Sequence, residues 1–349
     1  MPSPLEKLIF ETTQRARSLW YSAHYATAMR LAPRIDDLQT GRLPGWQAVY
    51  ADLNELMRQD WRNVEEGLYP APEPSSGSLA QQARRSAAFL RDLGAVNRRR
   101  LAANGSEIFE PELLRRYPRY YLQNFHYQSG GYLTPESAEL YDHQVEVLFV
   151  GGADAMRRQA LAALGRFQRS SPQREVRHLD IACGTGRFLE LLKTAHPRWR
   201  VAGIDLSPPY LAEARKVTSA WSRRLIAQAN AEDIPFADAA FDTASCVFLF
   251  HELPKKIRSR VAQEMFRVLK PGGRLFFLDS IQLGDRPDYD DLLERFPAAF
   301  HEPYYAEFIR ADLPAVFEKA GFAIVSSERV FFAKLIVLEK PDSRRNRST

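Results

Sequence analysis

Residues 176–205, VRHLDIACGTGRFLELLKTAHPRWRVAGID, decide the fold class of this 349-residue chain. An apolar run interrupted by Asp180 predicts a strand, and Gly184 and Gly186 follow it at once in a tight loop. Apolar residues at helical spacing come next, and a second apolar run ends at Asp205. The order of strand, glycine loop, helix and strand predicts a βαβ unit, which binds ligands at the carboxyl ends of its parallel strands. Asp205 follows the glycines by about 20 residues, the separation at which a carboxylate accepts the hydroxyls of a ribose.

The glycine loop argues against two common nucleotide ligands. A dinucleotide fingerprint requires G-x-G-x-x-G, whose third glycine lets the helix and the strand approach closely. Here the sequence is GTGRFL, with Phe188 and Leu189 where that glycine would stand. A triphosphate-cradling G-x-x-x-x-G-K-[ST] sequence is not present either. A nicotinamide oxidoreductase is therefore disfavoured.

Four segments of the chain resemble motifs of one family, the class I (Rossmann-like) S-adenosylmethionine-dependent methyltransferases. Residues 179–186, LDIACGTG, are similar to the first motif of the family, which is close to LDxGCGTG. The segment 229–236 (ANAEDIPF) resembles the adenine-binding segment, 241–248 (FDTASCVF) the fourth strand, and 266–275 (FRVLKPGGRL) the turn into the fifth. Four motifs in family order over roughly 100 residues are more specific than one glycine loop. The resemblance covers about residues 176–340 and is to methyltransferases of types 11 and 25.

The resemblance implies an α/β fold with a seven-stranded, doubly wound sheet, and apolar periodicity adds an N-terminal, mostly α-helical domain. Strands are expected near 177–182, 200–205, 224–229, 243–249 and 274–279, with a terminal hairpin at 322–327 and 330–338. Ser207 and Thr134 are expected to cap helices, and 69–77 should form a surface loop. We expect a helical cap, substrate or dimerisation region at 1–150, the methyltransferase domain at 151–341, and a flexible basic tail at 342–349.

Composition and charge point to an ordinary globular chain. The net charge is +5, and the arginine pairs and runs are mixed with acidic residues, so solvated helix faces are favoured over a nucleic-acid surface. The two cysteines fit neither a metal spacing nor a disulfide framework, which suits a reducing cytoplasm. Neither a signal peptide nor an apolar stretch of membrane-spanning length is expected. A homodimer is possible, and the sequence does not decide it.

The resemblance also implies the cofactor, S-adenosyl-L-methionine, and the residues that hold it. Gly184 and Gly186 let the backbone approach its methionine part, and Asp180 is expected to hold the ammonium directly or through water. Asp205 takes the ribose hydroxyls, and Asn230, where the family more often has aspartate, is expected to bond the adenine amine. The residues expected to bind the cofactor are Tyr127, Asp180, Ala182, Gly184, Thr185, Gly186, Asp205, Leu206, Asn230, Ala231, Glu232 and Phe248.

The acceptor side of the site is expected directly after the fourth strand. His251 is a candidate general base because the reference pKa of histidine is near neutrality, with Glu252 beside it. The equally weighted alternative is a histidine that caps a helix, and His126 and His301 compete for the catalytic role. The tetrapeptide [ND]-P-P-[YFW] of base-methylating enzymes is not present, and no acidic cluster suggests a metal.

An aromatic segment, residues 117–133, is expected either to pack the helical domain onto the sheet or to close over the cofactor, whose sulfonium aromatic faces attract. The second interpretation assigns acceptor contacts to Tyr121, Asn124, Phe125 and Tyr132. An aromatic insertion around 301–305, whose alternative role is to pack the terminal hairpin, adds Tyr304 and Tyr305. The favoured function is methyl transfer to oxygen, nitrogen or carbon of a small organic molecule. An RNA or protein methyltransferase and a cofactor-binding scaffold without transfer activity remain the alternatives.

Overall fold

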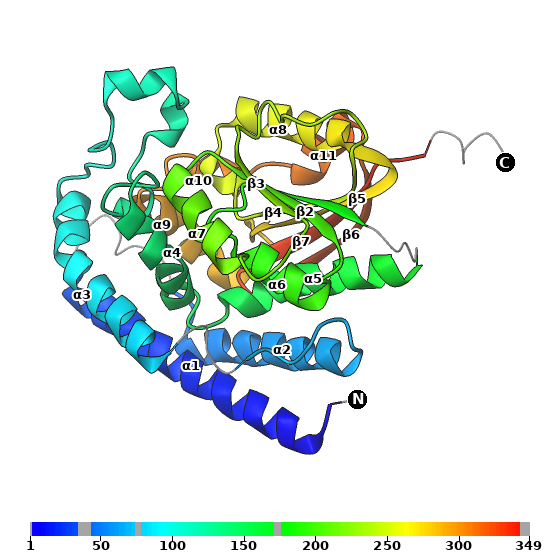
Figure 1. Ribbon diagram of the computed structural model, residues 1–349. Helices are drawn as coiled ribbons and strands as arrows, with labels where there is room; N and C mark the ends of the chain where they lie inside the picture. Colours follow the sequence, from blue (N-terminus) through cyan, green and yellow to red (C-terminus); the bar gives the residue numbers. More distant parts are fainter. Residues whose placement is uncertain (1, 34–42, 74–77, 171–175, 343–349) are drawn as a thin grey trace. The chain divides into compact units, whose positions relative to one another are not determined.

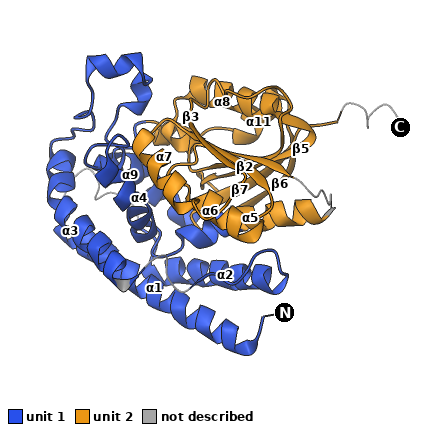
Figure 2. Cartoon of the chain, in the orientation of Figure 1, with its two compact units in different colours: residues 1–158, 286–303 blue, residues 159–285, 304–349 orange. Residues whose placement is uncertain are grey.

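The computed structural model describes residues 2–33, 43–73, 78–170 and 176–342. The chain divides into two compact units, residues 1–158 with 286–303, and residues 159–285 with 304–349 (Figure 2). The grouping of 286–303 with the first unit was not predicted from the sequence. Part of the expected surface loop, 74–77, and the tail from 343 onward lie outside the described residues.

The second unit is built on a seven-stranded sheet with the strand order β3-β2-β1-β4-β5-β7-β6 (Figure 1). Neighbours among β1 to β5 pair in parallel, whereas β7 pairs antiparallel with both β5 and β6. The predicted doubly wound sheet with a terminal hairpin is therefore confirmed. The strands are β1 (Arg177–Ile181), β2 (Arg200–Asp205), β3 (Arg224–Gln228), β4 (Phe241–Val247), β5 (Leu269–Ser280), β6 (Ala323–Val330) and β7 (Ala333–Glu339).

Helices cover both faces of this sheet. Consecutive residues of β5 point to opposite faces, where Phe276 meets Phe167 of α5 and Phe277 meets Phe317 of α11. Figure 1 shows α8 and α11 on one face and α5 and α6 on the other. Ser207 caps α7 as predicted, its hydroxyl accepting from the Tyr210 N–H. The helices are α5 (Ala153–Ser170, which begins in the first unit), α6 (Arg187–Ala195), α7 (Pro208–Val217), α8 (Lys255–Val268), α10 (Tyr305–Phe308) and α11 (Leu313–Ala320).

The start of β5 differs from the prediction. The segment 266–275 was expected to turn into a strand that begins at 274, but the strand begins at Leu269. Gly272 adopts a φ of 76°, and its N–H donates to the carbonyl of Lys340 at 2.7 Å. The pairing between β4 and β5 shifts register between Phe241 and Thr243. The glycines therefore form an irregularity within the sheet rather than a turn before it.

The first unit is helical. Thr134 caps α4 as predicted, and the core of the unit includes Phe89, Leu93, Leu140 and Val147. In the described part of the chain, no helix is both long and apolar enough to cross a bilayer. The elements are α1 (Pro4–Leu31), α2 (Trp46–Glu65), α3 (Leu79–Leu101), α4 (Pro135–Leu148), α9 (Asp290–Phe300) and the short 3-10 turns η2 (Pro111–Arg115), η3 (Arg119–Tyr121), η4 (Phe125–Tyr127) and η6 (Pro287–Tyr289).

A buried ion pair joins α2 to the first turns of α5 within the first unit. The guanidinium of Arg158 donates to both carboxylate oxygens of Asp60, at 2.8 and 2.6 Å. The Tyr69 hydroxyl donates to the same carboxylate at 2.7 Å. Asp60 is fully buried, so only these hydrogen-bonded partners offset the cost of removing its negative charge from water.

Candidate cofactor and transfer site

The glycine loop turns the chain sharply between β1 and α6. Gly186 precedes α6 with a φ of 81°, and a Cβ there would lie 2.8 Å from the Cα of Ala214 in α7. Gly184 has a φ of 53°, and a Cβ there would meet nothing nearer than a Tyr210 ring carbon at 4.0 Å. Gly186 is therefore required for packing, whereas the face of Gly184 is open to a ligand.

Asp205 ends β2 beside this loop. Its Oδ2 accepts from the N–H of Gly184 at 2.9 Å, and its Oδ1 accepts from the N–H of Ser207 at 2.8 Å. Burial raises the pKa of Asp205, and the backbone N–H groups oppose that shift. Each carboxylate oxygen has lone pairs for more than one donor. The side chain is therefore held in place and retains the capacity to accept ribose hydroxyls.

A line of buried hydrogen bonds fixes Asp180 on β1. Ser245 of β4 donates to Asp180 Oδ1 at 2.5 Å, so its oxygen accepts from His178 Nε2 at 2.9 Å. His178 Nδ1 then accepts from the Thr243 hydroxyl, also at 2.9 Å. Burial lowers the pKa of His178 to about 3, so the neutral ring carries its one proton on Nε2. Each group in the line therefore donates to the next, from Thr243 through His178 and Ser245 to the Asp180 carboxylate.

We expect Ser245→Ala to weaken binding of S-adenosylhomocysteine about tenfold, the effect of one charge-assisted hydrogen bond. The variant removes the donor that orients Asp180 and leaves the Nε2 proton of His178 without its acceptor. Calorimetric titration measures the affinity. Ser245→Thr, which keeps the hydroxyl, should restore most of it, and the exposed Ser222→Ala should have no effect. Equal affinity of Ser245→Ala and the wild type would contradict the orienting role.

The predicted adenine segment follows β3. Asn230 Oδ1 accepts from the N–H of Glu232 at 3.0 Å, which closes a local turn. Glu232 is half-buried and lies 3.3 Å from an Arg260 nitrogen. The carbonyl of Leu206 accepts from Gln228 at 3.0 Å, which links the ends of β2 and β3. The assignment of this turn, including Ala231, to adenine stays a prediction.

His251 and Asp279 form a hydrogen-bonded pair at the ends of the neighbouring strands β4 and β5. His251 Nδ1 lies 2.6 Å from Asp279 Oδ1. The N–H groups of Leu249 and Phe250 donate to Asp279 Oδ2 at 3.1 and 2.7 Å. Because the carboxylate accepts, Nδ1 carries the ring proton and Nε2 is the atom that takes up another. Glu252 Oε1 lies 3.9 Å from that Nε2.

Aromatic rings surround the His251 imidazole within the second unit. The ring of Tyr305 is buried, and its hydroxyl lies 2.6 Å from Ser280 Oγ at the end of β5. An apolar wall of this kind limits the access of water to the imidazole. The ring centroids that lie 6.0–6.5 Å from that of His251 belong to Phe248, Tyr305 and Phe308.

Arg258 anchors the loops on both sides of these rings. Its buried guanidinium donates to the carbonyl of Phe250 at 2.9 Å and to that of Tyr304 at 2.8 Å. Helix α8 therefore holds the turn that carries His251 and the start of α10 together. Tyr304 is half-buried at this point.

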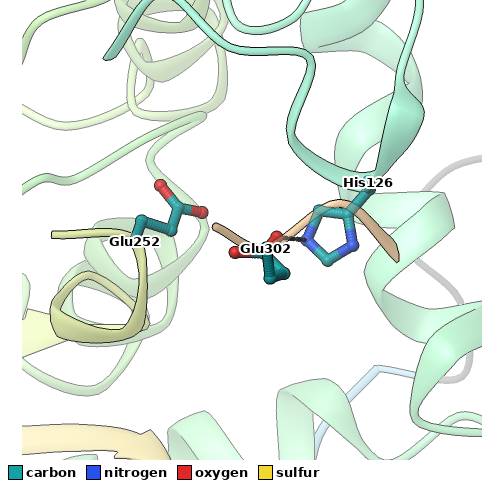
Figure 3. A group of neighbouring side chains, drawn as sticks. All are labelled: His126, Glu252 and Glu302. Carbon is teal, nitrogen blue, oxygen red and sulfur yellow. Dashed lines mark ion pairs between the residues drawn. The ribbon is translucent and has the colours of Figure 1, made fainter. Parts of the chain in front are cut away.

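Seven predicted site residues lie in the first unit, among them His126, Tyr127 and His301. His126 Nε2 is 3.3 Å from Oε1 of the buried Glu302, and a dashed line marks this ion pair in Figure 3. Glu252, also drawn there, belongs to the second unit. His301 Nε2 is 3.0 Å from the Gln123 side-chain oxygen, and burial lowers its pKa. Tyr127 is buried, its hydroxyl donating to a backbone carbonyl at 3.4 Å. Their roles toward a cofactor or an acceptor stay predictions.

The aromatic segment is well packed inside the first unit. Phe125 stacks on Tyr132 with ring centroids 5.4 Å apart, and Tyr121 meets Tyr132 at 6.0 Å. Both ends of the buried Asn124 amide bond to backbone groups. These contacts account for the segment as packing, and its contacts with an acceptor stay a prediction.

Sequence reasoning missed Asp279, Ser245 and His178. Asp279 follows the apolar run LFFL of an expected strand. The same signal identified Asp205, so Asp279 could have been predicted as a site residue from the sequence. Ser245 and His178 matter because β1 and β4 pair with Asp180 opposite Ser245 and His178 opposite Thr243. That register is not visible in either strand by itself.

Comparisons with known proteins identify a matching family and related sequences. The model of the "Methyltransferase domain" family matches residues 179–273. A demethylmenaquinone methyltransferase of Thermus thermophilus is 38% identical over 104 residues, covering 30% of this chain and 46% of the relative. One of Listeria monocytogenes is 30% identical, covering 42% of this chain and 70% of the relative.

A solved SAM-dependent methyltransferase of Aquifex aeolicus aligns with a TM-score of 0.43 at 18% identity, covering 60% of this chain and 99% of that one. The chain spans about half the length of the first curated relatives it matches. The alignment with the Listeria relative, however, covers more than two thirds of that protein, which is enough to assign this chain to its family. The chain belongs to the class I S-adenosylmethionine-dependent methyltransferases.

Proposed function

We propose that the protein transfers the methyl group of S-adenosyl-L-methionine to a small aromatic, quinone-like molecule. The observation that carries the proposal is the Asp205 carboxylate, bonded to the open glycine loop at the carboxyl ends of parallel strands. The printed names of the relatives, demethylmenaquinone methyltransferases, support the acceptor class.

The residues of the second unit fit this cofactor. The open face at Gly184 admits a ligand against the backbone, Asp205 offers acceptors to a ribose, and Asp180 offers a fixed anion to an ammonium. When bound, the cofactor supplies an electrophilic methyl group on a sulfonium. The protein then has to orient the acceptor, exclude water and remove a proton.

His251 is proposed to remove that proton at Nε2. Asp279 accepts a hydrogen bond from Nδ1–H, which keeps its proton, and the negative charge of the carboxylate stabilises the imidazolium that results. Glu252, 3.9 Å from Nε2, is the next group able to receive the proton.

We expect His251→Ala to lower kcat about 100-fold or more while S-adenosylhomocysteine affinity stays within about threefold, as removal of a general base does. Initial rates with a methyl acceptor and calorimetric titration measure the two quantities. Asp279→Asn should also lower kcat, because the amide has one accepting oxygen where both carboxylate oxygens accept, one from the His251 ring and the other from backbone N–H groups. Unchanged kcat in both variants would exclude a proton-transfer role for the pair.

Methyl-labelled cofactor incubated with the full-length protein and a panel of hydroquinones, naphthoquinols and phenols tests the function. Label is expected in a quinol or a phenol, with wild type but not with Asp205→Ala. Label in protein or in RNA would instead support the macromolecular alternative, and salt-dependent RNA retention would accompany the latter. Tight S-adenosylhomocysteine binding with no labelled product from cell extract would support the scaffold alternative. The homodimer and the cytoplasmic location stay predictions, the first testable by light scattering.

A further inference from the structure

The first unit contains a partly open, mainly apolar cavity of about 100 Å³. Its walls come from α1, α3, α4 and α9, with Tyr25, Ala28, Leu93, Val147 and Phe300 among the lining residues. A cavity of about 150 Å³ lined by apolar side chains holds one benzene ring. The cavity here is smaller than that but partly open, so it suits a single ring whose substituents project toward the opening.

Arg100 gives this cavity a positive charge. The guanidinium donates from Nε to the Ala299 carbonyl at 2.9 Å and from Nη1 to Asn97 Oδ1 at 3.1 Å. Its carbon lies 5.6 Å from the ring centroid of Phe300. Throughout residues 2–33, 43–73, 78–170 and 176–342, no carboxylate forms an ion pair with it, and Nη2 donates to none of these residues. Burial lowers the pKa of Arg100, and only the tyrosines Tyr127 and Tyr25 act against that shift.

The other ionisable groups in the wall have partners. Asp92 stands two helical turns before Arg100, about 12 Å along the axis of α3. Its Oδ1 accepts from the Ser129 hydroxyl at 2.5 Å, and Arg99 donates to that hydroxyl at 2.9 Å. His126 faces the Glu302 carboxylate at 3.3 Å. Among the described lining residues, Arg100 thus carries the positive charge that an anionic ligand would neutralise.

We propose that this cavity binds a small aromatic acid, with the ring among the apolar side chains and a carboxylate or phenolate oxygen on Arg100. A planar guanidinium recognises a carboxylate through directed hydrogen bonds, and these strengthen where water is excluded. Aromatic side chains line the cavity at Tyr25, Phe89 and Phe300, and they offer flat surfaces to a ring. The site goes beyond the proposed methyl transfer, because binding here needs neither cofactor nor turnover.

Calorimetric titration of the full-length protein with benzoate and with benzyl alcohol tests this site. The two probes share the ring and differ in charge, so we expect benzoate to bind at least about tenfold more tightly. Arg100→Gln should abolish that preference. Arg98→Gln, an exposed arginine on the same helix, should leave it unchanged. Ala28→Trp should fill the cavity and remove binding of both probes.

Equal affinities for the acid and the alcohol would overturn the proposal, as would a preference that survives Arg100→Gln or benzoate that produces no binding heat. Hexanoate binding as tightly as benzoate would overturn the aromatic assignment. If Arg100→Gln does not fold, Arg100→Lys keeps the charge without the planar fork and should lose part of the preference. S-adenosylhomocysteine titrated in parallel reports on the proposed transfer function separately.

Discussion

Asp205→Ala is expected to lose S-adenosylhomocysteine binding by about 100-fold or more, about 3 kcal/mol, while the protein stays folded. The variant removes the acceptor for the two ribose hydroxyls, and charge-assisted hydrogen bonds of this kind are each worth about 1.5–3 kcal/mol. It also removes the acceptor for the Gly184 N–H, so the loop loses the bond that holds it against β2. Calorimetric titration measures the affinity, and thermal melting shows whether the fold is kept.

Two further variants separate charge from shape at this position. Asp205→Asn keeps the shape but offers one accepting oxygen, whereas the carboxylate accepts N–H groups on both of its oxygens. We expect it to bind S-adenosylhomocysteine with an affinity between those of wild type and Asp205→Ala. Glu318→Ala, an exposed carboxylate on α11, is the control and should bind normally. Binding by Asp205→Ala within about threefold of wild type would exclude the ribose assignment.

Asp60→Ala is expected to destabilise the first unit by about 3–5 kcal/mol, because it leaves the buried guanidinium of Arg158 uncompensated. Burial by itself lowers the pKa of Arg158, and Asp60 more than reverses that shift. The Tyr69 hydroxyl loses its carboxylate acceptor in the same variant and keeps the longer bond, 3.3 Å, to the backbone carbonyl of residue 60. Urea unfolding followed by circular dichroism measures the loss.

Matched variants decide whether the buried charge is the cause. Glu55→Ala breaks exposed ion pairs on the same helix and should cost less than about 1 kcal/mol. Combining Asp60→Leu with Arg158→Met removes both charges and should recover most of the stability. An Asp60→Ala variant no less stable than Glu55→Ala would show that Asp60 is not needed to compensate Arg158.

Local signals in the sequence were sufficient to predict much of the fold and the place of Asp205 at the end of a strand. The glycine loop, the caps at Ser207 and Thr134, and Asp205 at the end of an apolar run all depend on residues close together in the chain. Such patterns specify an element and the residue at its end, so they predicted β1, α6 and β2 together.

The rest depends on contacts between distant residues. The start of β5 at Leu269 requires pairing with Phe241 and a bond from Gly272 to Lys340. The His251–Asp279 pair requires that β4 and β5 be neighbours in the sheet. An apolar run followed by an aspartate predicts a strand end, but it does not identify the side chain across from it.

The grouping of residues 286–303 with 1–158 has a consequence for the order of folding. Joining the two segments closes a loop of 127 residues, 159–285, and for a flexible chain this costs about 4 kcal/mol in entropy. Once the seven-stranded sheet has formed, the separation of the ends of that loop is already fixed, so most of this cost is gone. The sheet should therefore fold early in refolding, and α9 should dock with the N-terminal helices late.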